Sequence, residues 1–110
     1  MIFIVSKYLI PKGYSGLTFF PFIILKFKDA KNDLVIINHE KIHIKQQLEL
    51  LVLPFYIWYF IDFGLKYLKY KDVKIAYRNI VFEREAYANE NNIDYLKSRS
   101  FWAFCAYILN

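Results

Sequence analysis

The order of apolar and polar residues predicts that strands come first in this chain and helices follow. Apolar, β-branched and aromatic residues dominate two early runs, 2–10 (IFIVSKYLI) and 16–28 (GLTFFPFIILKFK), which are typical of β-strands. A turn signal, PKG at 11–13, separates the two runs. Because Pro21 cannot donate a backbone hydrogen bond, the second run is expected to be an edge strand or to be interrupted there.

From Leu34 onward the apolar positions recur at helical spacing, and Asn32 or Asp33 can cap the first helix. Pro54 either kinks that helix or opens a second one. A further helix is expected at about 72–96, and the remaining tail is expected to form a short apolar helix that closes the core.

These elements predict an α+β fold in one domain over residues 1–110. Short strands occupy about 2–28, and helices that carry the candidate site occupy 33–109.

Composition narrows the class of protein further. A chain that is 57% hydrophobic is not intrinsically disordered, and a single cysteine, Cys105, excludes both a disulfide framework and a cysteine-based zinc site. The net charge of +5 favours anionic surfaces, but the lysines are dispersed and no nucleic-acid motif occurs, so no nucleic-acid partner is predicted. The N-terminus lacks the features of a signal peptide, and a cytoplasmic location is expected.

Residues 50–61 (LLVLPFYIWYFI) form an apolar run that leaves two interpretations open. A membrane-spanning helix needs about twenty such residues, so a buried helix is the first interpretation. Aromatic residues and the flanking Lys66, Lys69 and Lys71 also suit a helix that lies on a membrane surface. The high aromatic content leaves a dimer open as well.

The two histidines of the chain, His39 and His43, lie four residues apart with Glu40 directly after the first. On a helix, positions i and i+4 share a face, so both imidazoles can reach one zinc ion. Glu40 is rotated by about 100° and suits a general base and acid beside the open coordination position of the metal. This is the chemistry of the H-E-x-x-H motif, and Zn²⁺ is the predicted cofactor.

A metal site needs a third ligand. The extended form of the motif has a third histidine six residues after the second, but this chain has Glu49 at that position. Better candidates lie in FEREAYANE (82–90), which contains Glu83, Glu85 and Glu90. The apolar surroundings and a nearby small residue favour Glu85 over Glu83, without deciding between them.

The pair NHEKIH and EREAYAN resembles the gluzincin metallopeptidases, in which a glutamate from a later helix joins H-E-x-x-H. It is most similar to the branch of CAAX prenyl-type proteases, antibiotic-sensor transducers and the small soluble minigluzincins. The resemblance implies a minimal zincin-like fold, which the length and the order of strands before helices suit. It implies that His39, His43 and Glu85 bind zinc and that Glu40 is the general base and acid. It also implies a supporting role for Asn89, where the family has an aspartate that holds a zinc-bound histidine.

The resemblance further implies that a strand within residues 17–28 forms a rim where an extended peptide pairs. The donor to the tetrahedral oxyanion stays open among Tyr14, Tyr77, Arg78 and Tyr87. The predicted function is therefore a zinc metalloendopeptidase acting on a peptide or protein substrate. The alternatives are a catalytically degenerate metal-binding domain and a membrane-associated interaction domain.

Overall fold

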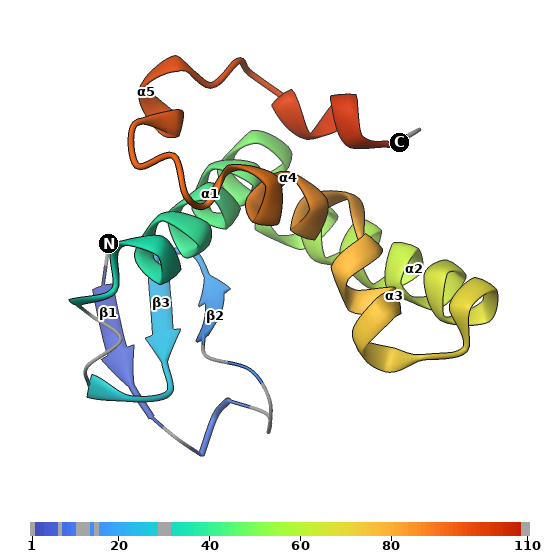
Figure 1. The fold of residues 1–110 in the computed structure, drawn as a ribbon, viewed down its shortest axis with the longest axis horizontal. Helices are drawn as coiled ribbons and strands as arrows, with labels where there is room; N and C mark the ends of the chain where they lie inside the picture. The colour runs from blue at the N-terminus through green and yellow to red at the C-terminus, as the bar shows by residue number, and fades with distance from the viewer. Residues whose placement is uncertain (1, 7, 11–13, 15, 29–31, 109–110) are drawn as a thin grey trace.

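A small sheet at the N-terminus lies against a set of helices, as the α+β prediction requires (Figure 1). The computed structural model describes residues 2–6, 8–10, 14, 16–28 and 32–108. The predicted turn at 11–13 lies outside the described residues.

The sheet has three strands, β1 (Ile2–Val5), β2 (Gly16–Phe19) and β3 (Phe22–Leu25), in the order β1-β3-β2. β1 runs parallel to β3, and β2 runs antiparallel to it through a tight turn. Pro21 lies in that turn, between the two strands, so the predicted interruption at Pro21 is confirmed. β2 is left as an edge strand beside α1 (Leu34–Leu50).

The first two helices meet at a sharp bend. Asp33 caps α1 by accepting hydrogen bonds from the backbone N–H groups of Val35 and Ile36. α1 ends at Leu51, which adopts a positive φ of 63°, and α2 (Val52–Tyr70) leaves at 112° to it. Pro54 falls in the first turn of α2, where its missing N–H has no intrahelical partner to lose. Pro54 therefore belongs to the opening of a second helix.

The single helix expected over 72–96 is wrong. The structure has α3 (Val73–Asn79), α4 (Val81–Asn89) and α5 (Tyr95–Ser98), followed by the 3-10 helix η2 (Ala103–Tyr107) in the tail. Ile80 is extended, and this separates α3 from α4. The buried carboxylate of Asp62, on α2, accepts a 2.7 Å hydrogen bond from the backbone N–H of Val81. A tertiary contact thus replaces the intrahelical bond that a continuous helix would make.

Within the described part of the chain, no single helix has the length and apolar character needed to cross a membrane. Only α1 and α2 taken together reach that length and composition, and the bend separates them.

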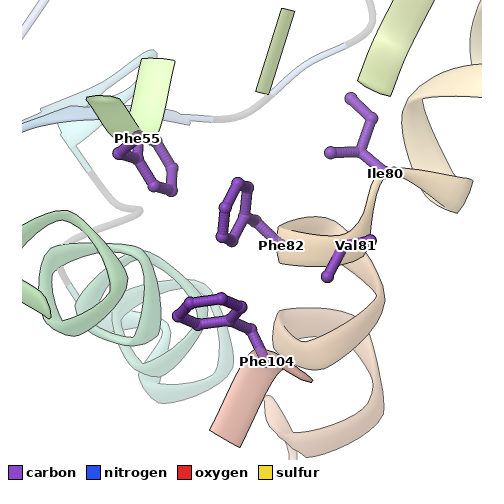
Figure 2. Close-up of a cluster of buried hydrophobic side chains, with 5 residues drawn as sticks. All are labelled: Phe55, Ile80, Val81, Phe82 and Phe104. Atoms are coloured by element: carbon purple, nitrogen blue, oxygen red, sulfur yellow. The ribbon is translucent and has the colours of Figure 1, made fainter. Parts of the chain in front are cut away.

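The main hydrophobic core joins α2, α4 and the tail. Figure 2 shows Phe82 between Phe55 and Phe104, beside Ile80 and Val81 at the start of α4. A second cluster, formed by Ile23, Leu25 and Ile44, packs β3 against α1. The main core thus packs α4 against α2 and the tail, the second cluster packs β3 against α1, and α1 and α4 contact each other directly.

Replacing Phe82 with alanine should lower the free energy of unfolding by about 3–5 kcal/mol, because a fully buried ring is removed from the core. Urea unfolding followed by circular dichroism measures the change. Leu68→Ala is the control, since Leu68 is 68% exposed and its loss should change stability by less than about 0.5 kcal/mol. Equal effects of the two substitutions would contradict this account of the core.

Candidate metal centre

Three buried side chains from α1 and α4 bring their metal-binding atoms together. His39 and His43 lie one turn apart on α1, and Glu83 comes from the first turn of α4. The Nε2 atoms of the histidines are 3.2 Å apart, and each is 3.1 Å from Oε1 of Glu83. The three atoms form a nearly equilateral triangle, which we call the His–His–Glu triangle.

The size of the His–His–Glu triangle fits a zinc ion. With Zn–N and Zn–O bonds of about 2.0–2.1 Å and tetrahedral angles, ligand atoms lie about 3.3 Å apart. The observed separations of 3.1–3.2 Å need only a small expansion to reach that value. The donor set of two imidazoles and a carboxylate is also one that zinc accepts.

The outer nitrogen of each imidazole determines which atom faces the triangle. Nδ1 of His39 lies 2.7 Å from Oε2 of Glu90, and Nδ1 of His43 lies 2.7 Å from Oε1 of Gln46. Gln46 directs its oxygen to His43 because its amide nitrogen donates to the carbonyl of Phe82 and to Glu85. Both partners are acceptors, so both Nδ1 atoms carry the proton.

It follows that, in the neutral imidazoles, both Nε2 atoms present lone pairs to the carboxylate of Glu83. Three lone pairs directed at one point repel one another unless a proton on an imidazole or a metal cation lies among them. The hydrogen-bond pattern therefore favours a positive charge at the centre of the His–His–Glu triangle, which either a proton or a metal ion can supply.

The pKa shifts have the same origin. Burial by itself would lower the pKa of His43, but the charge and hydrogen bond of Glu83 and the charge of Glu40 outweigh burial and raise it to about 9. For Glu83, burial acts to raise the pKa, but the charge of His43 and hydrogen bonds from both histidines hold it well below its usual range. Each shift stabilises positive charge beside an ionised Glu83.

The end of α4 is tied to α1 by Asn38, the residue before His39. Its amide nitrogen donates to the backbone carbonyls of Asn89, Glu90 and Asn92 at 2.9–3.2 Å. These bonds fix the C-terminal turn of α4 over α1 and so place the carboxylate of Glu90 against His39. The second carboxylate oxygen of Glu83 is held separately, by the hydroxyl of Tyr59 at 2.6 Å.

Glu40 lies beside the triangle under β2. It is buried, and the hydroxyl of Thr18 donates to its carboxylate. Burial raises the pKa of Glu40 against the opposing influence of His43, His39 and Thr18, and a raised pKa improves a carboxylate as a proton acceptor. A Cβ atom at Gly16 would lie 3.2 Å from the Glu40 carboxylate, so glycine there leaves room for this side chain.

Glu85 does not reach the histidines, and the expectation that it is the third ligand does not match the structure. Its fully buried carboxylate binds Arg99, with Nε at 2.5 Å and Nη2 at 3.0 Å, and also accepts from Tyr95 and Gln46. Burial would raise the pKa of Glu85, but these hydrogen bonds and the charge of Arg99 lower it. Arg99 also pairs with Glu49 at 2.6 Å.

Asn89 also differs from its expected role. Its amide nitrogen donates to the backbone carbonyl of Glu85 and to the hydroxyl of Tyr107, away from the histidines. Glu90, the next residue, supplies the carboxylate that supports His39.

The spacing of residues in the sequence is compatible with this arrangement but does not select it. Glu83 and Glu90 are seven apart, as are His39 and Gln46, and residues seven apart share a helix face. Glu85, two residues after Glu83, must face about 200° away from it.

Two cavities open on Glu40. One, of about 290 Å³, lies on the side of His39, and the other, of about 270 Å³, lies on the side of His43. The four residues considered as oxyanion donors all line the first cavity: Tyr14, Tyr77, Arg78 and Tyr87.

Comparison of the chain with protein-family models, with curated proteins and with solved structures finds no match. The gluzincin resemblance therefore rests on the motif residues alone.

Glu83→Gln and Glu85→Gln should separate the two candidate ligands. We expect Glu83→Gln to lower zinc affinity by more than about 100-fold, since loss of a ligand should exceed the 10–100-fold cost of losing an outer partner. Glu85→Gln should still bind zinc. Its free energy of unfolding should fall by about 3–5 kcal/mol, because Arg99 loses a buried charged partner.

Competition with a chromophoric chelator measures the affinity, and circular dichroism establishes that each variant is folded. Loss of zinc from Glu85→Gln with zinc retained by Glu83→Gln would reverse the assignment.

Proposed function

We propose that this chain is a zinc-dependent metallopeptidase in which His39, His43 and Glu83 hold the metal and Glu40 transfers protons. The observation that carries the proposal is the convergence of three lone pairs, at 3.1–3.2 Å, beside a buried carboxylate that lines two cavities. A cation at that point relieves the repulsion, and the cavities give a substrate access to it.

The number of ligands supports an enzyme over a structural zinc site. Structural zinc sites are closed by four protein ligands, whereas catalytic sites have three and keep one position open. Among the described residues, the cluster that could hold a metal has three members, His39, His43 and Glu83. The cluster borders both cavities that Glu40 lines, since His39 lines one and His43 and Glu83 line the other.

Each residue then has a distinct task in peptide hydrolysis. Zinc, when bound, supplies a Lewis acid that acidifies water and polarises a carbonyl oxygen. Glu40 accepts the proton of the attacking water and delivers it to the departing amine. The hydroxyl of Thr18 holds the carboxylate of Glu40 in place, and Glu90 and Gln46 keep the histidine lone pairs directed at the centre.

The edge of β2 supports a peptide as the substrate. The carbonyl of Thr18 and the N–H of Phe20 face away from the sheet and are bound by the side chain of Gln47. Gly16, two residues before Thr18, directs its backbone groups to the same side, because this direction alternates along a strand. Because the outward groups of Thr18 and Phe20 are already bound, an extended peptide over Glu40 would pair with the edge of β2 at Gly16.

The substitution Glu40→Gln should leave zinc binding intact and abolish hydrolysis. The amide keeps the size of the side chain but cannot accept a proton, so we expect a loss of about 10²–10⁴-fold in kcat/KM. Elemental analysis should find about one zinc per chain in both proteins, and cleavage of a quenched fluorescent peptide library measures activity.

Asp94→Asn is the matched control, since it removes one carboxylate from an exposed ion pair. It should retain full activity. Absence of zinc from wild-type protein prepared with excess zinc would refute the mechanism. Undiminished cleavage by Glu40→Gln would refute it as well.

A second proposal concerns association with a membrane surface, and the exposed face of α2 supports it. Six large apolar residues on this helix are each more than half exposed: Leu53, Ile57, Phe60, Ile61, Leu65 and Leu68. Their spacing of three and four residues makes one stripe along the helix, and Lys69 and Lys71 follow at its end. An apolar stripe beside lysines matches the interface of a bilayer that contains anionic lipids.

Vesicle flotation tests this proposal. The wild-type chain should float with vesicles that contain phosphatidylglycerol, whereas Ile57→Ser, Ile61→Ser and Leu65→Ser together should remove binding. Ile57→Leu, Ile61→Leu and Leu65→Ile together are the control, because they keep the apolar area, and they should float like the wild type. If the protein never floats with vesicles but forms a dimer that the serine substitutions dissociate, the stripe is instead the interface with a second copy of the chain.

A further inference from the structure

The two cavities beside Glu40 differ in their chemistry. Four residues line both of them: Tyr14, Gly16, Glu40 and Tyr77. A ligand bound over Glu40 can therefore extend into both cavities. The side chains found in only one cavity decide which part of the ligand enters it.

The cavity on the His39 side has cations in its wall. Lys74 and Arg78 lie four residues apart on α3, so they point to the same side of the helix, and both line this cavity. The Arg78 guanidinium lies 4.2 Å from the centre of the Tyr87 ring, and the Lys74 ammonium lies 4.0 Å from the centre of the Tyr14 ring. Aromatic rings attract and orient a cation without neutralising its charge.

The acidic groups of this cavity do not cancel the charge of Arg78. Among the described residues, Arg78 forms no ion pair with a carboxylate. Glu40 and Glu90 also line the cavity, but their hydrogen-bond partners are Thr18 and His39, so neither is paired with Arg78. An incoming anion thus meets a guanidinium that is held in place and still charged.

The cavity on the His43 side is aromatic. Its wall carries five rings that the first cavity lacks: Phe55, Tyr56, Tyr59, Phe60 and Phe63. Its volume of about 270 Å³ suits a single large side chain, since an apolar cavity of about 150 Å³ already holds benzene. This cavity accepts an apolar group, and no described lysine or arginine lines it.

We infer that the ligand of this centre carries a carboxylate, which binds Arg78 and Lys74 in the first cavity, together with a large apolar side chain, which occupies the second. The inference deepens the proposed function and rests on it for the position of the scissile bond. The two cavities fix the direction in which a peptide lies across Glu40, because exchanging its ends would bury the carboxylate among rings.

A carboxylate on a peptide has two sources, an acidic side chain or the free C-terminus. Arg78 can form the same bidentate contact with either. The two sources differ in where the peptide ends, since a C-terminal carboxylate ends the ligand inside the cavity and an acidic side chain lets the peptide continue.

Isothermal titration calorimetry on zinc-loaded Glu40→Gln protein tests the inference without turnover. The probes are acetyl-Phe-Ala-Ala-Glu and acetyl-Phe-Ala-Ala-Gln peptides, each prepared in both sequence orders and as the C-terminal acid and amide. At low salt we expect the best peptide with a carboxylate to bind about fivefold or more tightly than its neutral counterpart. Raising the ionic strength should reduce the difference.

Tested singly, Arg78→Gln and Lys74→Gln should each remove the preference for the carboxylate. Neither should change the affinity for the neutral peptide. Lys69→Gln removes one exposed lysine from α2 and should keep the preference. If peptides with an amidated C-terminus still show the preference for Glu over Gln, the carboxylate comes from the side chain. If tight binding requires a free C-terminal acid, the carboxylate comes from the C-terminus.

Equal binding of charged and neutral peptides would overturn the inference, as would a preference that persists in Arg78→Gln. The outcome is separate from the fate of the proposed function. Wild-type protein that cleaves peptides without any carboxylate preference refutes only the inference. A carboxylate preference in protein that neither binds zinc nor cleaves refutes only the peptidase.

Discussion

The structure depends on three lone pairs that meet at one point. His39, His43 and Glu83 would repel one another if nothing positive lay between them, and their side chains cannot turn away. The outer nitrogens of the histidines are held by Glu90 and Gln46, so neither ring can reverse its tautomer without leaving two acceptors face to face. The geometry of the triangle is therefore fixed by hydrogen bonds within the fold.

Several features of the fold serve this geometry from a distance. Gln46 keeps its oxygen on His43 because Glu85 accepts from its nitrogen, and Glu85 can stay ionised in the core because Arg99 pairs with it. Arg99 belongs to the tail of the chain and also binds Glu49 on α1. These buried charges hold Gln46 against the candidate metal centre. Glu85 is bound within this network, which explains why it is absent from the His–His–Glu triangle.

The position of α4 is the second requirement. The break at Ile80, the cap that Asp62 provides and the aromatic core around Phe82 together orient α4 so that Glu83 and Glu90 face α1. The same arrangement leaves α3 free to bring Arg78 to the side of His39, while α2 brings its rings to the side of His43. The bend at Leu51 and the break at Ile80 thus create both the centre and the asymmetry of the space around it.

The amino-acid sequence by itself determined the local features. The strands before the helices, a cap at Asn32 or Asp33, an edge strand or interruption at Pro21 and the shared face of His39 and His43 follow from short-range sterics and hydrogen bonding, and the structure selects Asp33 and the interruption. The sequence pattern did not predict the break at Ile80, because the cap that stabilises this break comes from Asp62, which is distant in sequence.

Only the tertiary structure decided between Glu83 and Glu85, and between Asn89 and Glu90. Glu83 and Glu85 lie within one turn of α4, and Asn89 and Glu90 are its last residue and its C-terminal cap. The local surroundings in the sequence favoured Glu85, which the structure places on Arg99 instead. Which member faces the histidines depends on the rotation of α4 about its own axis. That rotation is set by the packing of Phe82 and by the bonds from Asn38 to the end of α4, which are long-range contacts that no local pattern contains.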